Sequence, residues 1–105
     1  MGRRLWPDEK MEAIIGKVRY RVSDSVLLAH NSYWDNNDFT RHGRNTFLYR
    51  SPKGKYFAVH MTMWAGEKDR IEPLSEDTAY QWFEDLPEKE VKVEEAFPSI
   101  VVDSA

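Results

Sequence analysis

Three histidines are the only side chains in this sequence that change charge near neutral pH without help from their surroundings. They are His30, His42 and His60. No two of them have the i, i+4 spacing of metal ligands on one helix, and the chain has no cysteine to supply a thiolate. Asp35 and Asp38 precede His42, but their segment lacks the glycine and the bidentate glutamate of a calcium loop. The sequence therefore predicts no metal site.

The motifs of covalent and phosphate chemistry are also missing. None of the serines lies in a Gly-x-Ser-x-Gly elbow, and no glycine-rich phosphate loop follows a predicted strand. We therefore expect a protein that is not an enzyme and needs no cofactor. A small hydrolase that uses His42 or His60 remains as one alternative.

Basic and aromatic residues alternate around a predicted hairpin, in a pattern that is typical of nucleic-acid binding. Such residues hold phosphates and stack on bases. The candidates are Arg44, Arg50, Lys53, Lys55 and Tyr56. The net charge of −3 differs from the basic footprint of most nucleic-acid-binding domains. A nucleic-acid-binding module that uses these residues is therefore the first alternative, ahead of the hydrolase.

Charge is distributed unevenly along the chain, and this favours a contact with another protein. Residues 1–75 carry a net charge of +4, whereas residues 76–105 carry −7. Acidic surfaces steer and bind basic partners, and Tyr, Trp and Arg are enriched at the energetic centres of interfaces. The predicted partner-binding residues combine both types: Tyr33, Trp34, Asp35, Asp38 and Arg41 in a long polar loop, with Glu84, Asp85 and Glu88 at the end of a predicted helix.

The elements that must position these residues start with a hairpin over residues 45–63. Pro52 and Gly54 suit a three-residue loop with a bulge, which sets Tyr49 opposite Phe57. One face is then nearly all apolar: Phe47, Tyr49, Phe57, Val59, Met61 and Met63. The other face is mixed: Leu48, Arg50, Tyr56, Ala58, His60, Thr62 and Trp64.

A helix is predicted over residues 75–86. Ser75 is a natural N-cap, acids follow in the first turn, and Pro87 ends the helix. Its apolar residues have the spacing of one helical stripe: Ala79, Trp82, Phe83 and Leu86. We expect this stripe to pack on the apolar face of the hairpin.

The remaining segments complete a single α+β domain. The sequence predicts a short helix over residues 7–15, a strand over 17–22 and a short strand over 70–72, whereas 26–30 fits either a strand or a helical turn. We expect a small antiparallel sheet of three to five strands with one main helix on one face and a short N-terminal helix. The core would lie at about 17–86, with 87–105 as an extended acidic tail or an edge strand.

The sequence also bears on location and assembly. No apolar run approaches the roughly 20 residues that cross a bilayer, and no apolar segment follows the basic N-terminus. We therefore expect a cytoplasmic protein without a membrane partner. An exposed hairpin edge leaves a homodimer open.

A family resemblance adds to this interpretation. The chain resembles small uncharacterised proteins of bacterial phages, plasmids and integrated elements over roughly residues 17–86. The segments that carry it are Tyr20–Ser25, Leu48–Arg50, Gly54–Phe57, Ile71–Glu76 and Ala79 with Trp82–Glu84. Those relatives often carry a Thr-x-Thr-Ala-like segment where this chain has Ser23–Val26.

The resemblance implies a fold and a genomic habitat but no catalytic residues. Small acidic proteins of such elements are often inhibitors of host defence, including anti-CRISPR proteins. The leading hypothesis is therefore a binding protein that contacts a host protein or ribonucleoprotein complex, with direct nucleic-acid binding as the alternative.

Overall fold

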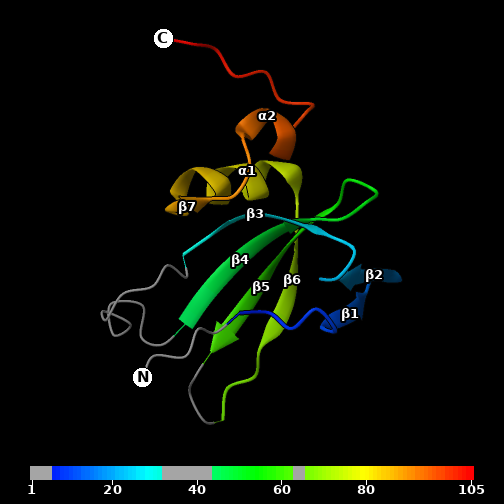
Figure 1. The fold of residues 1–105 in the computed structure, drawn as a ribbon. Helices are drawn as coiled ribbons and strands as arrows, with labels where there is room; N and C mark the ends of the chain where they lie inside the picture. Colours follow the sequence, from blue (N-terminus) through cyan, green and yellow to red (C-terminus); the bar gives the residue numbers. More distant parts are fainter. Residues whose placement is uncertain (1–5, 32–43, 63–65) are drawn as a thin grey trace.

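The computed structural model describes residues 6–31, 44–62 and 66–105 of the chain. Strands β3 to β7 form one antiparallel sheet in the order β6-β5-β4-β3-β7, and β1 pairs with β2 in a separate hairpin (Figure 1). The elements are β1 Glu12–Ile15, β2 Val18–Arg21, β3 Val26–His30, β4 Arg44–Arg50, β5 Tyr56–Thr62, β6 Arg70–Leu74, α1 Glu76–Asp85, β7 Glu88–Lys89 and α2 Val93–Ala96. The α+β class is confirmed, and the main sheet has five strands, within the predicted three to five.

The β4–β5 hairpin has the predicted register. Tyr49 pairs with Phe57 and Phe47 pairs with Val59. Gly54 has a φ of +81°, and its N–H donates to the carbonyl oxygen of Ser51 at 2.9 Å. The left-handed glycine closes the loop without a steric cost, and this local chemistry sets the pairing of both strands.

The predicted N-terminal helix is wrong, because residues 7–15 contain a turn followed by strand β1. Gly16 and Lys17 have φ values of 59° and 66°, and they form the two-residue turn between β1 and β2. The residues that resembled a helix start form a turn instead, in which the N–H of Met11 donates to the carbonyl oxygen of Asp8 at 2.9 Å. Ile14, which lies in β1, is 62% exposed.

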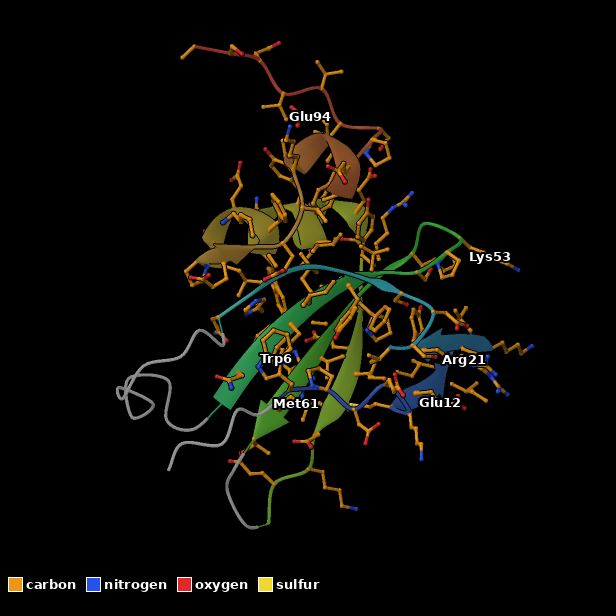
Figure 2. The ribbon with its side chains drawn as sticks, viewed as in Figure 1. Trp6, Glu12, Arg21, Lys53, Met61 and Glu94 are labelled. Carbon is orange, nitrogen blue, oxygen red and sulfur yellow. The ribbon has the colours of Figure 1, made fainter. Side chains whose placement is uncertain are left out.

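The second correction concerns the face of the sheet that α1 covers. Ala79 and Phe83 of α1 belong to one buried cluster with Leu48 and Tyr56, which lie on the mixed face of the hairpin. The apolar face is covered from the other side by the β1–β2 hairpin and the segment before it. That second cluster contains Tyr20, Val22, Phe47, Tyr49, Phe57, Val59, Met61 and Ile71, with Trp6 and Met11 packed against it (Figure 2).

Both faces of the sheet are therefore covered. The helix α1 packs on the mixed face, and the β1–β2 hairpin packs on the apolar face. Both covers bury apolar surface, at about 25 cal/mol per Å² removed from water. The mixed face accepts α1 where its residues are apolar or small, since Leu48 and Ala58 are fully buried there.

The chain order explains the position of α1. β6 is one edge strand of the sheet, and β7, which follows α1, pairs with β3 at the opposite edge. The ten residues of α1 are about 15 Å long, which matches the roughly 14 Å from the first to the fourth strand. The helix thus runs across the sheet from the edge at β6 toward the edge at β7, which the chain reaches two residues after Leu86 (Figure 1).

The segment after α1 packs on the helix layer. Phe97 is fully buried and stacks on Tyr56 with ring centroids 4.8 Å apart. Its ring also meets Tyr80 and Phe83 of α1 edge-on. Residues 87–105, expected to be an extended acidic tail or an edge strand, begin with the two-residue edge strand β7 and continue into the short helix α2.

Within the described residues, no helix is long and apolar enough to cross a membrane.

Candidate functional site

The outer surface of α1 is acidic because of how the helix is built. Ser75 caps its N-terminus, where the Ser75 hydroxyl accepts a hydrogen bond from the N–H of Thr78 at 3.2 Å. Ala79 and Phe83 face the sheet. The exposed residues follow at i, i+4, i+7 and i+8: Asp77, Gln81, Glu84 and Asp85. The helical period therefore places the predicted acids Glu84 and Asp85 on the solvent side, and Glu88 is half-buried just beyond them.

Among the described residues, Lys89 forms no ion pair with these acids, because its side chain turns to the carbonyl oxygens at the end of α1. Its ammonium donates to the carbonyl oxygens of Glu84 and Leu86 and lies 5.4 Å from the centroid of the Phe83 ring. A lysine in this position complements the negative end of the helix dipole. The positive charge of Lys89 therefore stabilises the C-terminal end of α1.

Some acids of this layer have partners, and others have none. Glu76 accepts a hydrogen bond from the Ser99 hydroxyl at 2.6 Å. Glu84 bonds with the Tyr80 hydroxyl, which raises the pKa of Tyr80. Five acids make no hydrogen bond or ion pair in the described part of the chain: Asp77, Asp85, Glu88, Glu94 and Glu95. We call these five residues the free acids of the α1–α2 layer, and Figure 2 labels Glu94 among them.

The predicted basic and aromatic residues lie apart from this layer, at the β4–β5 turn. Lys53 and Lys55 are exposed there, and Arg50 is half-buried (Figure 2). Tyr56 is only 5% exposed, and its hydroxyl donates to the carbonyl oxygen of Ala96 at 2.8 Å. Burial raises the pKa of Tyr56. The Tyr56 ring is thus enclosed beneath Phe97 and is not open to a stacked base.

The aromatic half of the predicted partner surface falls outside the described residues. The predicted site residues that lie outside the described ranges are Tyr33, Trp34, Asp35, Asp38 and Arg41, together with His42. Arg44 begins β4, but its side chain is not among those described. Of the predicted partner-binding residues, the structure therefore describes Glu84, Asp85 and Glu88.

A polar row that the sequence did not indicate crosses β4, β5 and β6 on the α1 side of the sheet. The Nε2 of His60 lies 2.8 Å from Oε1 of Glu72, and its Nδ1 lies 3.4 Å from the hydroxyl of Thr46. Trp82 of α1 meets the imidazole edge-on at 5.7 Å between ring centroids. Glu72 was not identified because the pairing of β5 with β6 has no local signal in the sequence.

A cavity of about 410 Å³ opens beside this row. Its walls come from the start of β4, the end of β5 and the segment that leads into β6. The lining residues are Asn45, Thr46, His60, Met61, Thr62, Glu67, Lys68 and Arg70. This volume lies within the range of about 300–1,000 Å³ that is typical of small-molecule sites.

The other described histidine is buried among aromatic side chains. His30 is buried between Trp6 and Phe47, with ring centroids 4.8 and 5.6 Å away. Its Nε2 lies 2.8 Å from Oε2 of Glu90, which ties the segment after β7 to the sheet. Since a substrate cannot reach a side chain buried in this way, His30 is a packing residue.

Within the described ranges, no group of three or more His, Cys, Asp or Glu side chains is arranged to hold a metal ion. No protein-family model, no curated protein and no solved structure matches this chain. The resemblance to proteins of phages and plasmids therefore stays a prediction.

Proposed function

We propose that this chain is a binding protein whose acidic α1–α2 layer contacts a basic surface of another macromolecular complex. The observation that carries the proposal is the set of free acids, Asp77, Asp85, Glu88, Glu94 and Glu95, combined with the contacts that hold Lys89 at the carbonyl oxygens of the end of α1. Residues 76–105 hold nine acids and two lysines, so this layer keeps a strong negative potential.

The packing beneath the layer supports the same function. Ala79, Phe83 and Phe97 are buried, so the acids project from a helix layer anchored to the sheet. A preorganised surface binds at a lower entropic cost than one that orders on contact. The carboxylates of this layer also carry the same sign of charge as the phosphates of a nucleic-acid backbone.

The partner class follows from this chemistry and from the family resemblance. Proteins that handle nucleic acids carry basic grooves for phosphates. We therefore expect the partner to be a host nucleic-acid-handling complex, with a CRISPR effector as one candidate, and the chain to inhibit it by occupying such a groove. No catalytic step is part of this function.

The test compares two variants with the same change in net charge. Asp85→Lys/Glu88→Lys reverses two free acids, whereas Glu9→Lys/Asp24→Lys reverses two exposed acids near β1 and β2, far along the chain from the layer. Tagged wild type and both variants are incubated with bacterial lysate, with and without nuclease treatment, and captured proteins are identified by mass spectrometry. The Kd of the captured protein is then measured by calorimetry.

We expect the wild type and the control variant to bind one stoichiometric partner, and the Asp85→Lys/Glu88→Lys variant to bind it about ten-fold more weakly or worse, because like charges would then face each other. Equal affinity of both variants would contradict the assignment of this surface. Capture that disappears after nuclease treatment would favour the nucleic-acid alternative.

A further inference from the structure

The cavity beside His60 contains two cationic side chains without strong partners. Lys68 makes no hydrogen bond or ion pair within residues 6–31, 44–62 and 66–105. Arg70 has a side chain that is 62% exposed, and its one ion-pair contact is the long distance of 3.6 Å from Nη1 to Oε1 of Glu72. Both residues line the cavity, so their N–H groups are available to a bound molecule.

The acids around the cavity differ from the cations, because each is held by a donor of the protein. Glu72 lies 2.8 Å from Nε2 of His60. Glu67 accepts a hydrogen bond from the Thr62 hydroxyl at 2.6 Å, and Asp69 accepts one from the Thr62 N–H at 2.8 Å. These contacts turn the carboxylates toward the protein, whereas the donors of Lys68 and Arg70 remain available.

The side chains of His60 and Thr46 form a polar wall of the cavity. A carboxylate at Nε2 favours the imidazole tautomer that carries its proton there, which leaves Nδ1 as the acceptor for the Thr46 hydroxyl. At 3.4 Å this second hydrogen bond is long, so the hydroxyl can turn to a ligand at little cost. The imidazole itself is held by Glu72 and by the edge of Trp82.

From this arrangement we infer that the cavity binds a small molecule through an oxyanion, a carboxylate or a phosphate group, held by Lys68 and Arg70 with the Thr46 hydroxyl as a third donor. A guanidinium and an ammonium are the donors that proteins use most for such groups. The cavity of about 410 Å³ is larger than the anionic group alone, so the ligand is an organic anion. This inference does not depend on the acidic α1–α2 layer.

The test is a titration of the ¹⁵N-labelled full chain followed by NMR, with three probes in separate arms: inorganic phosphate, a nucleoside monophosphate and citrate. We expect saturable shifts of the amides of residues 60, 62, 68 and 70 with a Kd of about 1 mM or tighter for the nucleotide or for citrate. A response to the nucleotide identifies a phosphate ester as the ligand class, and a response to citrate identifies a polycarboxylate.

Two matched variants complete the test. Lys68→Ala/Arg70→Ala removes both cations from the cavity, whereas Lys53→Ala/Lys55→Ala removes the same charge from the exposed β4–β5 turn. We expect the first variant to lose the shifts, with at least a roughly ten-fold weaker Kd, and the second to bind as the wild type does. Both should keep the dispersed spectrum of the folded chain, because all four side chains are exposed or lie near the surface.

The inference is overturned if none of the probes shifts these amides at about 10 mM, a concentration ten times the expected Kd. It is also overturned if both variants respond equally, because binding would then follow net charge rather than the cavity. Capture of the macromolecular partner by Lys68→Ala/Arg70→Ala should be unchanged, so this test and the test of the acidic surface fail independently.

Discussion

The hydroxyl of Tyr56 on β5 donates a hydrogen bond of 2.8 Å to the carbonyl oxygen of Ala96, forty residues later in the chain. The same ring stacks on Phe97 at 4.8 Å between centroids. This pair of contacts holds the C-terminal segment against the helix layer and encloses a tyrosine that the sequence placed on an open face. It also makes the packing of that segment measurable through one side chain.

Replacing Tyr56 by phenylalanine should destabilise the fold by about 1–2 kcal/mol. The stacked ring stays, but the buried carbonyl oxygen of Ala96 loses its donor, and an unsatisfied buried acceptor costs about that much. The free energy of unfolding is measured by urea denaturation. Tyr80→Phe is the control, because its hydroxyl bonds to the exposed carboxylate of Glu84 and should change stability by less than about 0.5 kcal/mol. Equal effects would show that residues 96–97 do not pack on Tyr56.

Lys17→Gly should stabilise the protein by about 0.5 kcal/mol or more. Lys17 has a φ of 66° in the turn between β1 and β2, a left-handed conformation that costs L-residues about 1–2 kcal/mol and glycine almost nothing. Part of this gain is offset by the greater freedom of glycine in the unfolded chain.

The thermal midpoint reports the effect of Lys17→Gly. Lys10→Gly serves as a comparison, because Lys10 lies before β1 and is not among the residues with a positive φ. A loss of stability in Lys17→Gly that matches the comparison would contradict the left-handed conformation of Lys17 in the turn between β1 and β2.

Tyr49 should ionise far above the usual range of tyrosine. Burial raises its pKa to about 12 from an ordinary value of 10. Below pH 10 both the folded and the unfolded chain carry the neutral phenol, so the full stability is present. Between pH 10 and 12 the unfolded chain releases this proton and the folded chain keeps it. The free energy of unfolding therefore falls with pH, by about 2–3 kcal/mol across this window.

The measurement for Tyr49 is a difference between two proteins. Urea denaturation at several pH values from 9 upward is compared for the wild type and Tyr49→Phe, so that lysines and the other tyrosines contribute equally to both. We expect the wild type to lose more stability than the variant over that range. Parallel curves would show that the Tyr49 hydroxyl reaches solvent.

The candidate sites differ in how far the sequence could predict them. The exposure of Glu84 and Asp85 follows from the helical period, which is a local property. The row of Thr46, His60 and Glu72 depends on two strand pairings. No turn motif in the sequence predicts the second of these, the pairing of β5 with β6. The enclosure of Tyr56 depends on a segment forty residues away.

Two local elements of this protein could be predicted from its amino-acid sequence alone. The register of β4 with β5 follows from the turn at Pro52 and Gly54, and the start of α1 follows from the cap at Ser75. These features depend on backbone hydrogen bonds and φ preferences within a few residues, which any context leaves intact.

Tertiary contacts, and not local sequence, determine that α1 packs on one face of the sheet and the β1–β2 hairpin on the other. Both faces of the β4–β5 hairpin offer apolar surface, and hydrophobic burial has no direction of its own. The choice depended on the β1–β2 hairpin, which fills the apolar face, and on the edge-to-edge path from β6 through α1 to β7. That path leaves α1 on the mixed face, its acids in solvent and the cavity beside His60 open.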